Sequence, residues 1–389
     1  EAQGELRHFL HGLRYYADLA TKLQGSYQPL PATLGESYGL VIRRPVGVVA
    51  AIVPSNYPLT LMGTKVGPAL VAGNAVVLKP ASTTPLTALM IGELFQEAGL
   101  PPGVLNVVTG KGASIGEALV GHPEVRRVAF TGETETGRRI MEVAGPGFKR
   151  VTLELGGSDP VIVCPDADIR RAMKGVLIGR LWNAGQSCLA GKRLYVFDQV
   201  YDECVDQLLA ELDRYEPGPG WVKPEKPKIR LGPLHTDHQR ATLLDQVADS
   251  KRRGGEILFG DEAPDGERPG FFLGPTLVAD PPDDSRVACE ETFGPILPIF
   301  RVRDMDEAIA RAHDSRYGLG SSVWTHDARL IHRAAHELDA GMTWVNQIHY
   351  GYDELPFGGV KDSGIGREHG IEGLDHYTEP KSVVVGGLS

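Results

Sequence analysis

Apolar residues recur in the first part of the chain as short β-branched runs, and a segment with helical spacing follows each run. Runs without polar alternation are typical of strands that are buried on both faces, as in a parallel sheet covered by helices. The expected strands are 48–53, 75–78, 104–108 and 128–130, and the expected helices are 61–70, 85–98, 113–120 and 137–143. This pattern predicts an α/β fold whose ligand groups gather at the strand ends.

A second α/β region follows from Pro160. Its expected helices are 169–181, 199–212, 240–253 and 305–313, and its expected strands are 194–196 and 296–300. A strand-like segment at 39–44 precedes the first sheet. The run 381–385 at the end has no local partner, so we expect it to join a distant or neighbouring sheet. An amphipathic helix that reaches Leu19 opens the chain.

Composition and charge narrow the class of protein. A length of 389 residues favours two or three structural units, and 42% hydrophobic and 23% charged residues are ordinary for a globular protein. A formal net charge of −10 and a pI near 5.7 argue against nucleic acid or an anionic membrane as a partner. No apolar run is long enough to span a bilayer.

The four cysteines have no CxxC spacing and no accompanying histidine pattern, which argues against zinc and against a disulfide framework. We therefore expect no metal and a reduced, cytoplasmic location.

Two residues carry the strongest chemical signal. Cys188 lies among small and amide residues in Asn-Ala-Gly-Gln-Ser-Cys-Leu-Ala-Gly, and Glu154 precedes two glycines in Leu-Glu-Leu-Gly-Gly. A soft nucleophile and a carboxylate, each beside backbone-exposing glycines, suggest covalent catalysis with a separate general base. The alternatives are a buried structural thiol for Cys188 and a capping or salt-bridging carboxylate for Glu154.

Three weaker signals accompany this pair. The run from Phe130 to Gly137 lies at a strand-to-helix turn, where glycine lets the backbone approach a phosphate, or forms only a tight turn. Lys79 ends a parallel strand and could reach a ribose or phosphate, or could be a solvated lysine. Asn56 is fixed between two prolines, as a preorganised oxyanion donor or an ordinary turn residue.

Taken together, these runs resemble the aldehyde dehydrogenase superfamily over nearly the whole chain, from Phe9 to Val385. Asn56 matches the family's oxyanion asparagine, Glu154 its general base and Cys188 its nucleophile. The remaining matches are Lys79 for the cofactor lysine, Gly132 and Gly137 for the Gly-x4-Gly turn, Glu291 for the residue that holds the nicotinamide ribose, and the segments 344–346 and 356–364 that close the site.

The resemblance implies a Rossmann-like cofactor domain with a parallel sheet, an α/β catalytic domain and a small oligomerisation element of strands. We assign 1–26 and 46–156 to the cofactor domain, with 363–377 packing back on it. We assign 157–362 to the catalytic domain, and 27–45 and 378–389 to the oligomerisation element. The expected assembly is a homodimer or homotetramer.

The resemblance also implies that the chain oxidises an aldehyde to the acid with NADP or NAD. Cys188 attacks the carbonyl, hydride passes to the nicotinamide, and water activated by Glu154 hydrolyses the thioester. The expected cofactor-binding residues are Pro54, Ser55, Lys79, Ser82, Gly132, Gly137, Leu155, Gly156, Glu291 and Phe293. The expected substrate pocket contains Tyr57, Thr64, Trp182, Ser187 and Phe357.

The chain departs from the family's pattern at several positions. Ser55 replaces a tryptophan, and Ser82 stands where strictly NAD-dependent relatives often carry a glutamate that repels a 2′-phosphate. Thr64 and Trp182 fall where succinic semialdehyde dehydrogenases place arginines, so we expect uncharged aliphatic or aromatic aldehydes. The family also extends upstream of Glu1. The alternatives are a catalytically silent scaffold, a succinic semialdehyde-type enzyme and an acylating or phosphorylating relative.

Overall fold

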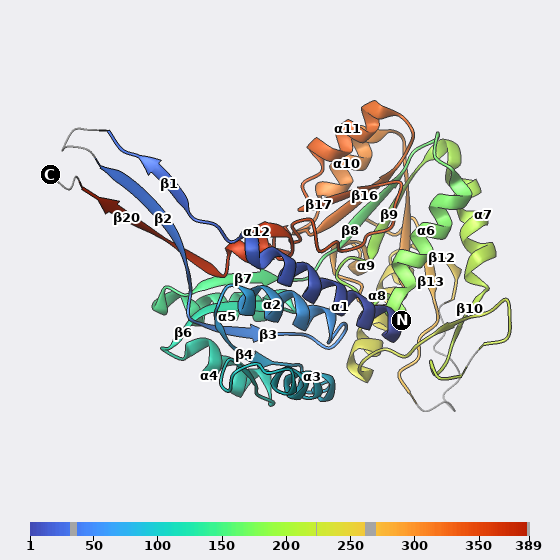
Figure 1. Cartoon of the computed structure of the whole chain (residues 1–389). Helices are drawn as coiled ribbons and strands as arrows, with labels where there is room; N and C mark the ends of the chain where they lie inside the picture. Colours follow the sequence, from blue (N-terminus) through green and yellow to red (C-terminus); the bar gives the residue numbers. More distant parts are fainter. Residues whose placement is uncertain (32–36, 223, 261–269, 387–389) are drawn as a thin grey trace. The chain divides into compact units, whose positions relative to one another are not determined.

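The computed structural model describes residues 1–31, 37–222, 224–260 and 270–386. Its chain divides into two compact units. The first unit comprises Glu1–Glu154, Gly351–Phe357 and Ile365–Ser389, and the second comprises Leu155–Tyr350 and Gly358–Gly364. Figure 1 labels the helices and strands of both units.

The first unit is built around a six-stranded sheet with the order β19-β7-β6-β3-β4-β5. Strands β3 to β7 pair in parallel; the β-branched runs predicted β3 to β6 of this set, whereas β7 was not predicted. The strands are β3 (Val48–Ile52), β4 (Ala75–Lys79), β5 (Leu105–Val107), β6 (Val125–Thr131), β7 (Arg150–Glu154) and β19 (Gly364–Ile365). The helices are α1 (Ala2–Leu19), α2 (Thr60–Val71), α3 (Leu86–Glu97), α4 (Glu117–Gly121), α5 (Thr134–Ala144) and α12 (Gly370–Asp375).

Helices α1 and α2 supply much of the core of this unit. Phe9 and Tyr16 of α1 and Met62 and Val66 of α2 are almost fully buried against the strand residues Val49, Ala51, Val76, Leu78 and Ala129. Small residues in α2 permit this close packing, because a side chain at Gly63 would begin 2.8 Å from the Phe9 ring. The core therefore fixes α2, which carries residues of the candidate site.

A separate antiparallel sheet with the order β1-β2-β20 completes the first unit. It consists of β1 (Ser26–Pro29), β2 (Tyr38–Pro45) and β20 (Thr378–Val385). The C-terminal run thus pairs with β2 along its whole length, from Tyr38 opposite Val385 to Pro45 opposite Thr378. In Figure 1 these strands reach beyond the helices that cover the six-stranded sheet. Both segments that the sequence assigns to oligomerisation contribute to this sheet, although 32–36 and 387–389 lie outside the described residues.

The second unit contains a seven-stranded sheet with the order β12-β13-β14-β9-β8-β16-β17, parallel except for the β12–β13 pair. The strands are β8 (Asp159–Val163), β9 (Gly191–Phe197), β12 (Glu256–Phe259), β13 (Thr276–Ala279), β14 (Ile296–Val302), β16 (Gly320–Trp324) and β17 (Met342–Val345). The helices are α6 (Ile169–Leu181), α7 (Tyr201–Leu212), α8 (Asp237–Arg252), α9 (Arg286–Cys289), α10 (Met305–His313) and α11 (Ala328–Glu337).

Two small sheets accompany it. Strand β10 (Tyr215–Pro217) pairs with β11 (Ile229–Leu231), and β15 (Tyr317–Gly318) pairs with β18 (Val360–Lys361). No helix in the described part of the chain is long and apolar enough to cross a membrane.

The predicted elements agree with the structure in type, with two kinds of difference. The predicted helix 113–120 is divided into a π-helical turn, Gly112–Gly116, followed by α4. Several elements were not predicted: strands β1, β7, β8, β10 to β13 and β15 to β19, and helices α9, α11 and α12. Strand β16 reads Gly-Ser-Ser-Val-Trp, and its Ser321 hydroxyl bonds Met342 O at 3.2 Å. A buried strand whose hydroxyls find partners in the next strand gives no hydrophobic signal.

Candidate active site

Cys188 lies in the second unit, on a loop between α6 and β9 that has a constrained backbone. After α6 the chain enters the left-handed region at Asn183 (φ 53°), Ala184 (φ 55°) and Gly185 (φ 76°). Non-glycine residues in this region carry strain that the surrounding structure must offset. The Gln186 side chain does so, because it donates to Asn183 O at 3.0 Å and accepts the His235 N–H at 2.8 Å. The loop is therefore held in one shape before it reaches the half-buried Cys188.

The other three thiols do not share this setting. Burial raises the pKa of both Cys164 and Cys204 to about 12, which suppresses their thiolate forms at neutral pH. Burial also raises the pKa of Cys289, whose sulfur contacts Asp283 O at 3.0 Å. None of the four cysteines, all of which lie among the described residues, forms a disulfide.

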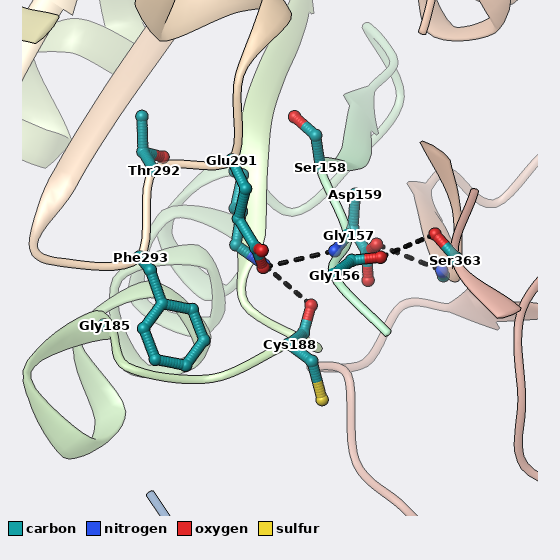
Figure 2. Close-up of polar contacts among 12 residues, drawn as sticks. Gly156, Gly157, Ser158, Asp159, Gly185, Cys188, Glu291, Thr292, Phe293 and Ser363 are labelled. Carbon is teal, nitrogen blue, oxygen red and sulfur yellow. Dashed lines mark hydrogen bonds and ion pairs between the residues drawn. The ribbon is translucent and has the colours of Figure 1, made fainter. Parts of the chain in front are cut away.

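A buried lysine joins Cys188 to Glu291. The Lys192 side chain is fully buried, and its Nζ donates to Cys188 O at 2.7 Å and contacts Glu291 Oε1 at 3.1 Å. The same carboxylate oxygen accepts the Gly157 N–H at 3.1 Å. Figure 2 shows the Cys188 carbonyl on the side of Glu291, with the sulfur pointing away from it. The Lys192 ammonium thus contacts both the main chain of the nucleophile and the carboxylate that is expected to bind the cofactor.

Position 156 has no room for a side chain. A Cβ at this position would begin 2.5 Å from Glu291 Oε2 and 3.3 Å from the Tyr317 ring. Ser363 holds the Gly156 peptide in place, because its Oγ donates to Gly156 O at 2.7 Å and accepts the Gly318 N–H at 3.0 Å. Leu155 N–H donates to Ser363 O at 3.0 Å. These contacts bring Leu155, Gly156, Glu291 and Cys188 together within the second unit.

Arg180 is fully buried and fastens the segment that follows Glu291. Its guanidinium donates to Thr292 O at 2.6 Å, to Ile296 O at 2.7 Å and, through a short contact, to Gly294 O. Burial lowers its pKa to about 9, so the group stays charged at neutral pH. These donors are thus directed at main-chain carbonyls near Phe293, which is itself half-buried.

Glu154 ends β7 in the first unit and is almost fully buried, at 3% exposure. Neither of its carboxylate oxygens has a hydrogen-bond partner among the described residues. Burial raises the pKa of Glu154 well above its usual value, and the nearby charge of Glu368 adds to this, while Lys65 and Arg367 oppose it. A carboxylate in such surroundings is a stronger base than an exposed one and has unused acceptor capacity for a water molecule.

Two buried residues that the sequence did not single out pair beside Glu154. Lys65 Nζ contacts Glu368 Oε1 at 2.7 Å and donates to Thr131 Oγ1 at 2.6 Å. Thr64 Oγ1 lies 3.0 Å from the other Glu368 oxygen and 3.1 Å from Leu61 O, and these two acceptors share its one proton. The available signal was a lysine in the otherwise apolar run of α2. Thr64, expected in the substrate pocket, therefore directs its hydroxyl at a carboxylate.

The other expected cofactor residues of the first unit occupy strand ends and turns. Lys79 ends β4, where burial lowers its pKa and its Nζ donates to Pro80 O at 3.2 Å. Gly132 N–H donates to Glu154 O at 3.0 Å, and a Cβ on Gly132 would begin 2.5 Å from the Phe130 ring. Gly137 lies in the first turns of α5, whose N-terminus follows this turn.

The remaining expected residues are placed as follows. Pro54, Ser55, Asn56 and Tyr57 are half-buried between β3 and α2, and Ser82 is exposed after β4. Phe357 is buried, with its ring centroid 5.3 Å from that of His369. In the second unit Trp182 is 41% exposed and Ser187 is half-buried. No group of acidic, histidine and cysteine side chains suited to a metal occurs in the described part of the chain.

The second unit thus carries a cysteine on a constrained loop, and the first unit carries a buried carboxyl group and, at Gly132, a turn where a Cβ would overlap a neighbouring ring. The model of the aldehyde dehydrogenase family matches residues 1–383, and the chain belongs to that family. The resemblance, the α/β fold and the expectation of an enzyme are thereby confirmed.

Two relatives within the family show a high similarity to this chain. Phenylacetaldehyde dehydrogenase from Pseudomonas fluorescens is 44% identical over 379 residues, which are 96% of this chain and 74% of the relative. Succinate-semialdehyde dehydrogenase [NADP(+)] GabD from Escherichia coli K12 is 38% identical over 386 residues, or 99% of this chain and 78% of the relative.

Solved structures of similar proteins have the same fold as this chain. An NADP-dependent enzyme from E. coli superposes with a TM-score of 0.94 at 38% identity, covering 99% of this chain and 78% of that one. PnpE in complex with nicotinamide adenine dinucleotide superposes with a TM-score of 0.93 at 40% identity, with the same coverage. Both predicted cofactors therefore occur among the relatives.

Proposed function

We propose that the chain oxidises an aldehyde to the carboxylic acid with NADP or NAD, using Cys188 as nucleophile and Glu154 as general base. The observation that carries this proposal is the setting of Cys188. Its carbonyl is anchored by Lys192, its sulfur points away from that anchor, and left-handed residues constrain the loop before it. Such preorganisation of a soft nucleophile favours covalent catalysis over a structural role.

The chemistry divides between the two residues. The Cys188 thiolate adds to the aldehyde carbon, and the Asn56 amide stabilises the oxyanion of the thiohemiacetal. A bound nicotinamide supplies the acceptor for the hydride that leaves this carbon. Glu154 then takes a proton from water as the water oxygen adds to the thioester, and the carbon–sulfur bond breaks to release the acid and the thiolate.

The cofactor residues fit a dinucleotide on structural grounds. Gly132 lies before the N-terminus of α5, an eleven-residue helix whose first N–H groups suit a pyrophosphate. Gly156 approaches Glu291 so closely that a Cβ there would begin 2.5 Å from its Oε2. Pro54, Ser55, Lys79, Ser82, Gly137, Leu155 and Phe293 complete the proposed set.

We infer that uncharged aliphatic or aromatic aldehydes are the preferred substrates. Thr64 is committed to the Glu368 carboxylate, and the Arg180 guanidinium is committed to carbonyls, so neither residue favours a substrate anion. Tyr57, Trp182, Ser187 and Phe357 would form the rest of the pocket. The similarity to phenylacetaldehyde dehydrogenase supports this inference, whereas the similarity to GabD keeps succinic semialdehyde as the second candidate. Comparing kcat/KM for phenylacetaldehyde, hexanal and succinic semialdehyde decides between them.

The division of labour is tested with three variants. Cys188→Ala should abolish turnover, whereas Cys289→Ala, which removes an exposed thiol, should retain it. Glu154→Gln should release about one equivalent of reduced cofactor in a rapid burst and then turn over slowly. A steady-state rate of Glu154→Gln equal to that of the parent would contradict the assignment of the base and would favour an acylating relative. If the parent protein itself shows no activity, the interpretation as a catalytically silent scaffold is favoured.

We also propose a homodimer or homotetramer that forms through β2 and β20. Strand β20 is an edge strand, and its Val384 is 68% exposed. A cytoplasmic location remains our proposal, and the absence of CxxC spacing and of disulfides among the four described cysteines is consistent with it.

A further inference from the structure

Lys192 is an unusual residue in its surroundings. It is the second residue of β9, all of whose residues are buried, and its side chain has no exposed surface. A lysine is almost never fully buried unless its charge is paired, because the lost hydration must be replaced. Here a carbonyl at 2.7 Å and a carboxylate at 3.1 Å replace it. Both partners belong to the proposed catalytic machinery.

The Glu291 carboxylate is divided between two sides. Its Oε1 is held by the Lys192 ammonium and the Gly157 N–H, whereas its Oε2 faces Gly156, where no side chain intervenes. Lys192 therefore holds Oε1 and, with the Gly157 N–H, sets the orientation of the whole carboxylate. Without Lys192 the carboxylate would keep its charge and lose the group that orients it.

The Cys188 peptide is oriented by the same ammonium. Because the carbonyl and the side chain of one residue leave the backbone in different directions, drawing the Cys188 carbonyl toward Lys192 directs the sulfur away (Figure 2). The lysine follows Cys188 by four positions, so the chain returns on itself to make this contact. The contact thus closes the loop that carries the nucleophile onto the start of β9.

We propose that Lys192 is a positioning residue that couples the Glu291 carboxylate to the Cys188 nucleophile. It sets the direction of the sulfur through the Cys188 carbonyl and balances the negative charge of Glu291 next to the Cys188 main chain. The inference rests on the proposed roles of Cys188 and Glu291. Lys192 touches no reacting atom, so its effects appear in the reactivity of the thiol and in cofactor affinity.

The charge balance predicts opposite signs for two single substitutions. Lys192→Met leaves the Glu291 carboxylate uncompensated, which disfavours the thiolate and moves the pH midpoint of Cys188 alkylation upward. Glu291→Gln leaves the ammonium uncompensated and moves the midpoint downward. Each shift should be about one pH unit. The double variant restores neutrality and should return close to the parent, and Lys192→Arg, which keeps the cation, should stay there.

Other charges around the loop stay constant in this comparison. Arg180 lies near Gly185 O at 3.5 Å, and Asp159, paired with His349 at 3.1 Å, lies beside Gly157. Both remain in every variant. Lys174→Met, which removes an exposed lysine from α6, is the matched control and should leave the midpoint unchanged.

The first measurement is the rate of iodoacetamide alkylation of cofactor-free protein from pH 5 to 10, read from the Cys188 peptide by mass spectrometry. The second is the Kd for NADPH by fluorescence titration. Lys192→Met should weaken binding about tenfold in the parent and hardly at all in the Glu291→Gln background. Unfolding midpoints of all variants identify any that fail to fold, and the partly exposed Glu291 provides a second, milder substitution.

Several outcomes overturn the proposal. They are a downward or absent shift for a folded Lys192→Met, an upward or absent shift for Glu291→Gln, and an equal loss of NADPH affinity in both backgrounds. If the two variants shift the alkylation midpoint in opposite directions but NADPH affinity does not change, the charge balance stands and the proposed role of Glu291 in cofactor binding is wrong. Retained turnover in Cys188→Ala would instead overturn the proposed function, so the two failures are distinguishable.

Discussion

Replacing Gly185 by alanine tests how closely the nucleophile loop must approach the segment that bears Glu291. Gly185 has φ 76°, and a Cβ there would begin 2.4 Å from Gly294 O, 2.5 Å from Gly294 C and 3.0 Å from Pro295 N. These are main-chain atoms, so rotation of a side chain cannot relieve the overlap. Either the nucleophile loop or the 291–295 segment must move.

The cost has two parts. A left-handed backbone at a non-glycine residue costs roughly 1–2 kcal/mol, and inserting a methyl group into a packed interior costs roughly 1–3 kcal/mol. We therefore expect Gly185→Ala to lower the free energy of unfolding by about 3 kcal/mol. Movement of Gly294 would also disturb its contact with Arg180, so NADPH affinity should fall about tenfold.

The assay is urea unfolding followed by NADPH titration, with Gly254→Ala as the control. Gly254 lies in the same unit, has φ 101° and has no atom within 4 Å of its Cβ position. Its substitution should cost only the backbone part, about 1–2 kcal/mol, and leave NADPH affinity unchanged. Equal losses of stability in the two variants, with unchanged NADPH binding, would refute the close approach as the reason for glycine at position 185.

Three further predictions follow from named groups. Glu154→Gln should unfold at a higher urea concentration than the parent at neutral and alkaline pH, because the raised pKa of Glu154 makes the folded parent lose stability as pH rises. The difference in urea midpoint should vanish below about pH 4.5, and a difference that does not change with pH would contradict the prediction. Asp353, whose pKa is lowered by hydrogen bonds from His369, His8 and His11 although burial opposes this, contributes its full stabilisation above about pH 4, so Asp353→Asn should cost most stability at pH 6 and progressively less as the pH falls below 4. The exposed, uncharged Ser82 should allow NADP at least as well as NAD, and Ser82→Glu should shift kcat/KM toward NAD; outright rejection of NADP by the parent would show this interpretation to be wrong.

The sequence predicted the elements whose burial is uniform. Strand β3 is buried at all but its first residue and reads as one apolar run, so its position and parallel pairing followed from the pattern. Strand β16 is equally buried but contains glycine and two serines, and its partners lie in β17 and β8. Periodicity cannot reveal a strand whose polar groups are satisfied by segments remote in the chain.

Among the site residues, too, some could be predicted from the sequence and others could not. Cys188, Glu154 and the glycine turns were accessible because small residues beside a reactive group form a local pattern. The buried cations were not, because their partners are distant or belong to the main chain. Lys65 meets Glu368, 303 positions away, and Arg180 meets carbonyls that no sequence pattern encodes.

One sequence signal could nevertheless have identified these cations. Lys65 interrupts the apolar run of α2, and Lys192 stands next to Arg193 at the start of the apolar β9, so each charge occupies a position that periodicity assigns to the interior. Burial of an unpaired charge costs several kcal/mol, and a fold can retain one there only by directing a partner at it. In this chain the partners are Glu368, beside the proposed base, and Glu291, beside the proposed nucleophile. A charge at an interior position therefore indicates where a distant segment must be anchored, and both anchored segments here carry residues of the candidate site.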